Sequence, residues 1–321
     1  MRKENDMEKL MVSSSPHFHS KIRTKNIMLD VIIALIPATI AAIVLYGMKA
    51  ALIVAVCVAT SVTAEFFFNL ICKKTQTVGD LSAIVTGLLL ALSLSTKVTL
   101  WQCMVGSIFA IIVVKCLFGG IGCNFANPAV TARVFLIIAF GKVAGGAATN
   151  FASPELISSA TPLEVIAGGN GTLPSLVDML LGNRGGAIGE SCAIALLLGL
   201  VYLIVKQIIS WHTPVVYVAT VFVLSLIIKQ DLTIALYQVL GGGLLIGAIF
   251  MATDYSTTPQ HNLGKVIFGL GCGVITILIR FYGSYPEGVS FAILLMNILT
   301  PYIDKIGISK PFGAGGNKNE K

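Results

Sequence analysis

Long apolar runs separated by short polar breaks dominate the sequence. Ile27–Tyr46 and Ala50–Cys72 are each long enough for the roughly 20 residues that a helix needs to cross a bilayer. Further apolar runs of similar character follow them: Leu81–Leu94, Trp101–Phe118, Ala129–Gly141, Ser191–Ile208, Pro214–Lys229, Leu232–Ala252, Lys265–Phe281 and Val289–Ile306. This pattern predicts an all-α polytopic membrane protein with about ten transmembrane helices.

Some of these runs are too short to cross a bilayer as regular helices. Leu81–Leu94 and Ala129–Gly141 are the shortest, and both are flanked by glycine or polar residues. Short or broken helices of this kind usually line a site inside the membrane. In the run Leu232–Ala252, we expect Gly241-Gly242-Gly243 and Gly247 to let neighbouring helices approach closely.

The longest polar segment, residues 142–190, divides the apolar runs into a first membrane half, 27–141, and a second, 191–306. A polar segment, 1–26, precedes them and a polar tail, 307–321, follows. Each half contains a glycine turn that leads to a proline, from Gly119 to Pro128 and from Gly283 to Pro286. Five runs in each half would give the halves opposite orientations, so we expect two inverted five-helix repeats.

The composition excludes an ordinary soluble protein. The sequence is 55% hydrophobic and 12% charged, whereas soluble domains are about 25% charged. The formal net charge of +7 does not indicate a nucleic-acid partner, because no basic face is encoded. The 7 cysteines include no Cys-x-x-Cys pair, so neither a disulfide framework nor a cysteine-bound iron–sulfur site is expected. We also expect no nicotinamide site, since no Gly-x-Gly-x-x-Gly follows a predicted strand.

Lysine and arginine predict the orientation in the membrane. With about ten spans both termini share one side, and that side collects most of the basic residues, including those of segment 1–26 and Lys73-Lys74. The positive-inside rule therefore predicts cytoplasmic termini in a bacterial cell membrane. Segment 142–190 is then extracytoplasmic, and the turns near Asn127 and Asp254 are cytoplasmic.

Several ionisable residues lie in or near apolar runs, where burial in lipid costs at least ~2.5 kcal/mol each. Lys115 and Arg133 lie near run ends, where long side chains can snorkel to the interface. Asp30, Glu65 and Asp254 are candidates for an ion path, although structural pairing is an equally good interpretation.

Two polar motifs carry the candidate chemistry. Ser158-Ser159-Ala160-Thr161, followed by Pro162, lies in the extracytoplasmic segment and would by itself indicate a simple turn. Asn124-Phe125-Ala126-Asn127, followed by Pro128, lies on the cytoplasmic side and would by itself indicate the cap of a broken helix.

The order of these motifs on this span pattern resembles the D subunit of the Rnf electron-transport complex. The chain is similar, more distantly, to the B subunit of sodium-translocating NADH:quinone oxidoreductase. The resemblance covers nearly the whole sequence, from Ser13 to Asn297. The supporting blocks are Thr86–Leu92, Asn124–Ala129, Ser158–Leu163, Phe250–Asp254 and Tyr285–Ala292.

The resemblance implies two flavin sites. The family attaches FMN through a phosphoester to the threonine that ends a Ser-Gly-Ala-Thr motif, which here is Thr161, with Ser158, Ser159 and Ala160 before it; Ser159 stands where glycine is usual. We expect the acceptor hydroxyl to be exposed in an outer loop, within reach of an attaching enzyme. The family also holds a non-covalent riboflavin at positions that match Asn124 and Asn127, whose amides suit the polar edge of the flavin ring.

The implied function is that of a membrane subunit in a ferredoxin:NAD⁺ oxidoreductase, a redox-driven ion translocase. It would pass electrons between an outer covalent FMN and an inner riboflavin, coupled to Na⁺ or H⁺ transport. Its partners would be other membrane and peripheral subunits, including an FMN-carrying subunit and iron–sulfur subunits, together with membrane lipid.

Two alternatives predict no flavin. One is an inverted-repeat solute channel or transporter, in which the Asn and Ser/Thr motifs line a pore. The other is a structural anchor for other subunits. Flavin bound to the purified chain would distinguish the electron-transfer subunit from both.

Overall fold

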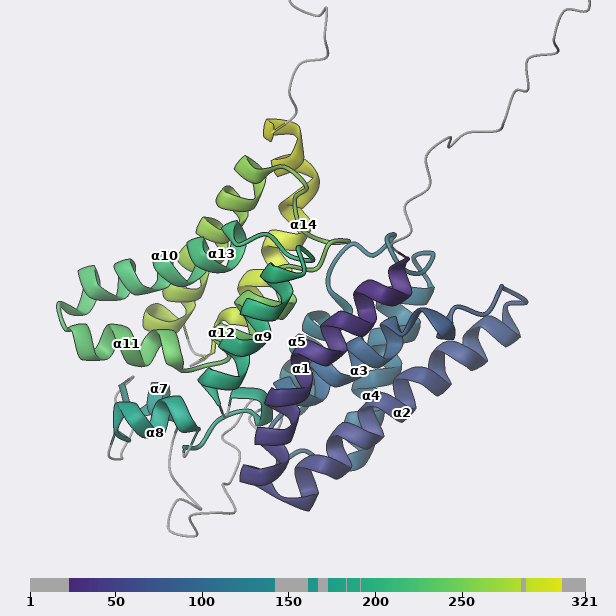
Figure 1. Cartoon of the computed structure of the whole chain (residues 1–321), viewed down its shortest axis with the longest axis horizontal. Helices are drawn as coiled ribbons and strands as arrows, with labels where there is room; N and C mark the ends of the chain where they lie inside the picture. The colour runs from purple at the N-terminus through teal and green to yellow at the C-terminus, as the bar shows by residue number, and fades with distance from the viewer. Residues whose placement is uncertain are drawn as a thin grey trace, which may run out of the picture.

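The computed structural model describes residues 23–141, 161–166, 173–182, 184–190, 192–283 and 287–307, and every regular element in these ranges is helical (Figure 1). In the first half these are α1 (Thr24–Tyr46), α2 (Met48–Ile71), η1 (Val78–Asp80), α3 (Ser82–Ser93), α4 (Leu100–Ile108), η2 (Phe109–Cys116) and α5 (Pro128–Phe140). The middle segment holds α7 (Pro162–Ile166), α8 (Leu176–Leu181) and η4 (Ile188–Glu190). The second half contains α9 (Ala193–Val205), α10 (His212–Lys229), α11 (Leu232–Leu240), α12 (Leu244–Ile246), η5 (Gly247–Met251), α13 (Asn262–Tyr282) and α14 (Val289–Gly307).

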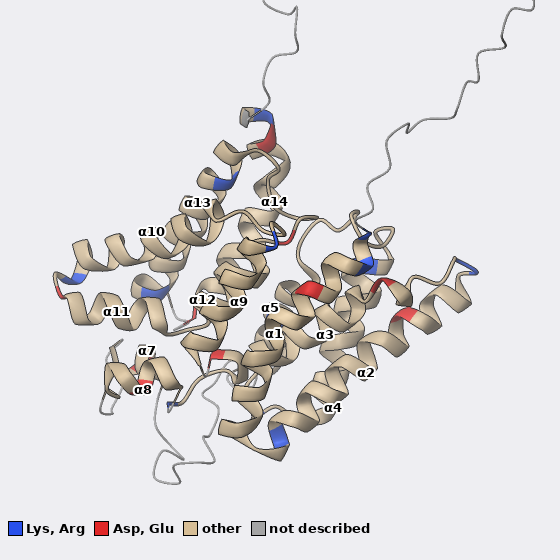
Figure 2. Cartoon of the chain, viewed as in Figure 1, with Lys and Arg blue, Asp and Glu red and all other residues tan. Residues whose placement is uncertain are grey.

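The outer faces of the long helices are apolar. On α1, α2 and α10, large side chains such as Val44, Ile71 and Ile227 are 73%, 78% and 65% exposed. Apolar surface of this extent is unfavourable in water and favourable against lipid chains. Figure 2 shows few charged positions along these helices, and many of the charges lie near helix ends or in connections.

Helix length confirms a multi-pass membrane protein. In the described ranges, five helices are long and apolar enough to cross a membrane, namely α1, α2, α10, α13 and α14. The pair formed by α11 and α12–η5 is apolar enough only when taken together, and its parts are bent by 58°, as in a broken span or a re-entrant loop. The apolar helices α3, α4–η2, α5 and α9 are shorter. The predicted short runs Leu81–Leu94 and Ala129–Gly141 thus fold as the short helices α3 and α5.

The predicted run Leu232–Ala252 is interrupted in its middle. The helix stops at Leu240 and resumes at Leu244, because Gly242 and Gly243 adopt left-handed backbone angles, with φ of 64° and 65°. Glycine adopts this region without the steric penalty of a Cβ. The three glycines therefore act as a helix break, and the carbonyls at the end of α11 need partners from elsewhere.

The helices pack in a similar order in the two halves. Helix α2 packs against α3 and α4, whereas α10 packs against α11 and α13. Across the two halves, α1 contacts α9 and α5 contacts α14. Helix α3 lies in the interior, since nearly all of its side chains are buried.

The described ends of the chain and the middle segment lie at opposite ends of the molecule. In Figure 1, α1 begins and α14 ends in the upper part of the view, whereas α7 and α8 lie at the bottom. Thr161 immediately precedes α7, so this residue is far from the first turn of α1.

Candidate functional site

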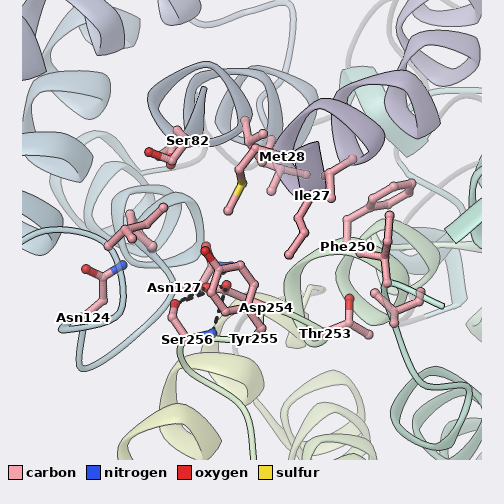
Figure 3. Close-up of a pocket in the computed structure, with 18 of the residues that line it drawn as sticks. Ile27, Met28, Ser82, Asn124, Asn127, Phe250, Thr253, Asp254, Tyr255 and Ser256 are labelled. Carbon is pink, nitrogen blue, oxygen red and sulfur yellow. Dashed lines mark hydrogen bonds between the residues drawn. The ribbon is translucent and has the colours of Figure 1, made fainter. Parts of the chain in front are cut away.

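A pocket opens where two π-helices end. The π-helices η2 and η5 continue α4 and α12, and the loops that follow them meet the start of α1. They enclose a cavity that is open to solvent on one side, and its empty volume of about 780 Å³ includes this open space. π-Helical turns frequently occur at functional sites. In Figure 3, Ile27 and Met28 of α1 lie across this pocket from Asn127 and Asp254.

Asn127 is both a helix cap and part of the pocket wall. Its Oδ1 accepts hydrogen bonds from the backbone N–H groups of Ala129 and Val130, at 3.0 and 3.3 Å, which caps α5. Its Nδ2 donates to the Met251 carbonyl at 3.3 Å and to Asp254 Oδ2 at 3.5 Å. The capping interpretation of Asn127 is therefore confirmed, and the amide also joins the start of α5 to the end of η5.

Asn124 differs from Asn127 because its amide oxygen is unused. This Oδ1 is buried and has no hydrogen-bond partner within the described ranges. Leaving a buried acceptor unpaired costs about 1–3 kcal/mol, which an N–H group of a bound molecule would offset. The loop that holds Asn124 also contains Gly119, Gly120 and Gly122, each with positive φ. The residue lines the same pocket as Asn127.

Asp254 holds together the loop that follows η5, which lies next to Asn127 in the wall of the pocket. Its carboxylate accepts hydrogen bonds from the hydroxyls of Ser256 and Thr257 and from the Ser256 N–H. Burial raises the pKa of Asp254, and these hydrogen bonds act in the opposite direction. The structure therefore brings together Asn124, Asn127 and Asp254, which are not contiguous in the sequence.

The other two ion-path candidates are paired. Asp30 Oδ1 accepts a hydrogen bond of 2.7 Å from the Tyr202 hydroxyl, which links α1 to α9. Glu65 accepts two hydrogen bonds of 2.8 Å from Lys115 Nζ and one of 2.6 Å from the Thr77 hydroxyl. These contacts support structural pairing for both residues and leave an ion path untested.

Lys115 and Arg133 face the interior of the bundle and do not snorkel. Both side chains are almost completely buried, at 2% exposure. Each has a carboxylate partner inside the bundle, Glu65 for Lys115 and Glu287 for Arg133. Pairing removes the need to reach the interface, because the opposite charge replaces water as the partner.

Thr161 begins α7 through a reciprocal pair of hydrogen bonds. Its Oγ1 accepts from the Glu164 N–H at 3.1 Å, and its own N–H donates to Glu164 Oε2 at 2.8 Å, which is a capping box. Thr161 is 6% exposed, so the expectation of an exposed hydroxyl is wrong for this conformation. Ser158, Ser159 and Ala160 lie outside the described residues.

Buried arginines surround the helix break beside α7. Arg184 donates to the Leu240 carbonyl at 2.6 Å, and Arg280 donates to the carbonyls of Gln238, Gly241 and Gly242 at 2.6–3.2 Å. These donors replace the intrahelical partners that the end of α11 lacks. The space around Gly242 is filled by Leu163 and Arg280, so α7 rests directly on the break.

The sequence pattern did not predict this arginine cluster. Arg184 lies in the polar segment and Arg280 in an apolar run, and the carbonyls that they reach at the break are 38–56 residues away along the sequence. The sequence does contain one signal, which is three consecutive glycines in an apolar run of a chain that also carries an arginine in another apolar run. No group of three or more His, Cys, Asp or Glu side chains in the described ranges has the geometry to hold a metal ion.

Comparison with known proteins gives consistent matches along the whole sequence. The sequence model of the NQR2, RnfD, RnfE family matches residues 11–313. The D subunit of the Na⁺-translocating ferredoxin:NAD⁺ oxidoreductase complex of Acetobacterium woodii is 44% identical, over 97% of this chain and 98% of its own length. The D subunit of the proton-translocating ferredoxin:NAD⁺ oxidoreductase complex of Clostridium ljungdahlii is 36% identical, over 94% and 96%.

A third relative comes from Methanosarcina acetivorans. The D subunit of its ion-translocating oxidoreductase complex is 31% identical, over 97% of this chain and 100% of its own length. These relatives and the family match cover nearly all of the sequence. The chain therefore belongs to the NQR2, RnfD, RnfE family.

Proposed function

We propose that this chain is the flavin-carrying membrane subunit of an ion-translocating ferredoxin:NAD⁺ oxidoreductase complex. The observation that supports it most is the pocket at the ends of η2 and η5, which collects Asn124, Asn127 and Asp254 in a chain similar throughout to D subunits of such complexes. When bound, a flavin supplies one- and two-electron transfer, and the chain's own task is to hold it and set its surroundings.

The lining of the pocket suits riboflavin in its mixture of apolar and polar groups. Its apolar wall, which includes Met28, Leu89 and Phe250, offers surface for a flat ring. The side-chain amide of Asn124, which lines the pocket and whose oxygen is unpaired, offers hydrogen-bonding groups for the polar edge of the ring. In this proposal Asn127 shapes the wall through its hydrogen bonds, and Asn124 contacts the ring.

FMN attachment belongs at the other end of the molecule, on Thr161. The contacts of α7 with the helix break around Gly242 support this, since a covalent anchor needs a fixed base. The Thr161 hydroxyl oxygen accepts a hydrogen bond from the Glu164 N–H and still carries its own proton, which esterification would replace. Because this hydroxyl is buried, attachment requires α7 to move away from the bundle, or to precede its docking.

The proposal also includes an orientation of the chain in the membrane and an internal repeat. We place the described ends of the chain in the cytoplasm and α7 outside, as the Lys and Arg distribution indicates. Counting the short helices and the bent pair as spans gives about ten, and the matching packing of α2 and α10 supports two inverted five-helix repeats.

The two flavins would act in series. The hydrocarbon core is ~30 Å thick, too far for one efficient electron transfer, so a cytoplasmic relay is needed besides an outer one. Electrons would reach this subunit from an FMN-carrying partner and iron–sulfur subunits of the complex. Transport of Na⁺ or H⁺ would accompany their passage.

Intact-mass analysis of the chain tests the covalent assignment. We expect the wild-type chain to carry an FMN-sized addition and Thr161→Asn to lack it. Asparagine is as good an N-cap as threonine but has no hydroxyl to esterify, so α7 remains capped. Glu164→Gln is the matched control: it keeps a capping-box partner and should keep the addition. An FMN-sized mass retained on Thr161→Asn would show that the attachment lies elsewhere.

A further inference from the structure

The buried pair Lys115–Glu65 lies between two cavities. Lys115, on the π-helix η2, lines the pocket of Asn124 and Asn127. Glu65, on α2, lines a second cavity with an empty volume of about 530 Å³. The two side chains are 3% and 1% exposed. A charge pair in this position therefore separates the pocket from the second cavity.

The Lys115 ammonium is held by three acceptors. Two are the carboxylate oxygens of Glu65, at 2.8 Å each, and the third is the Ser82 hydroxyl, at 2.6 Å. Ser82 also lines the pocket. The three hydrogens of the ammonium are thus used, one of them by a residue that itself lines the pocket.

The carboxylate side of the pair is also fixed. The Thr77 hydroxyl donates to Glu65 Oε1 at 2.6 Å, and Asn69 Nδ2 donates to the Thr77 oxygen at 3.0 Å. These groups lie on the side of the second cavity. The pair therefore has a fixed polarity, with its positive member next to the pocket and its negative member farther away.

Lys115 is the one cation among the described residues that line the pocket, and Asp254 is the one carboxylate. Reduction transfers an electron into the pocket and so adds negative charge there. In the weakly polar interior, a fixed cation nearby stabilises that charge far more than it would in water.

We infer that the positive charge of Lys115 raises the reduction potential of the flavin in this pocket, and that the negative charge of Glu65 partly offsets this effect. This inference rests on the proposed riboflavin site. Lys115 is then a positioning and electrostatic residue, whose resting counter-ion is Glu65. The two members of one ion pair should affect the potential in opposite directions, which a merely structural role would not produce.

The test is a redox titration of the full-length chain in detergent, with dithionite as the reductant. It uses the Thr161→Asn background, so that the pocket flavin is the one that titrates. Lys115→Gln should make this flavin harder to reduce, and Glu65→Gln should make it easier. We expect about a tenfold change in the one-electron equilibrium constant in each direction, which is about 59 mV. Lys115→Arg, which keeps the charge, should remain close to the parent.

Lys115→Gln leaves a buried carboxylate unpaired, so this variant can fold poorly. A second comparison therefore does without it. The double variant Glu65→Gln/Lys115→Gln has neither charge of the pair, and its potential should lie below that of Glu65→Gln alone. Equal potentials in these two variants, with flavin bound in both, would overturn the role of Lys115. Absence of any titratable flavin from the parent would instead contradict the proposed function and is distinguishable from that result.

Discussion

Asn124 and Asn127 differ in what remains available for a ligand. The Asn127 oxygen accepts two backbone hydrogen bonds and its nitrogen donates to Met251 and Asp254, so this amide already holds the protein together. The Asn124 oxygen is buried without a partner in the described part of the chain, and this residue also lines the pocket. Under the proposed function, Asn124 would recognise the flavin edge, and Asn127 would set the shape of the pocket.

The two asparagines accordingly predict different results on substitution. Asn124→Leu keeps the bulk and removes the unpaired acceptor, so it should weaken riboflavin binding about tenfold while leaving the midpoint of thermal unfolding nearly unchanged. Asn127→Leu removes the cap of α5 and should destabilise the protein by about 0.5–2 kcal/mol besides losing the flavin. Extracted riboflavin and thermal unfolding, measured on the same preparations, check both expectations. Full riboflavin content in Asn124→Leu would remove that residue from the site.

At the scale of elements, the break between α11 and α12 shows how irregular backbone is tolerated inside a membrane protein. A broken helix leaves carbonyls that lipid cannot satisfy, and Arg184 and Arg280 supply the missing donors. The guanidinium group suits this task, because it presents several N–H donors in a fixed plane. The break is consequently a rigid structure and a firm base for α7.

Gly242→Ala tests the rigidity of this break. The new methyl group would lie 2.3 Å from Leu163 Cδ1 and 2.6 Å from Arg280 Nη2, on a backbone with φ of 64°. Strain and overlap together should destabilise the protein by about 2–5 kcal/mol. Gly79→Ala is the matched control, because a methyl group there meets nothing within 4 Å. Thermal unfolding in detergent measures both, and similar midpoints for the two variants would show that the break is adaptable.

Much of the helical pattern was predictable, because each span is a local apolar run. The helix break was not, since glycines in an apolar run fit close packing as well as an interruption. The pairs Lys115–Glu65 and Arg133–Glu287 join residues 50 and 154 positions apart, and one sequence contains no information on such pairing. The burial of Thr161 escaped prediction for the same reason, because it depends on the position of α7 relative to α11.

At the scale of the whole molecule, the proposed electron path requires two distant sites. The pocket lies beside the first turn of α1, and α7 lies at the other end of the molecule (Figure 1). If α7 is outside, the pocket is on the cytoplasmic side. The protein then connects two flavins across the membrane rather than holding both on one face.

Thiol labelling of whole cells tests this orientation. Val177 on α8 is 62% exposed, and Cys123, in the loop beside the pocket, is an exposed native cysteine. Val177→Cys should react with an impermeant thiol reagent in intact cells, because the positive-inside rule places α8 outside. Cys123 should react after lysis and serves as the internal control. Labelling of Cys123 in intact cells, with Val177→Cys protected, would reverse the map.

The most direct test of the proposed electron path is ferredoxin:NAD⁺ turnover by the assembled complex containing Asn127→Leu. The variant should be shown beforehand to lack riboflavin and to retain FMN on Thr161, by extraction and by intact mass. We predict that turnover is then lost, because electrons cannot cross the ~30 Å hydrocarbon core without the inner relay. Normal turnover in a complex that demonstrably lacks this riboflavin would contradict the proposed path.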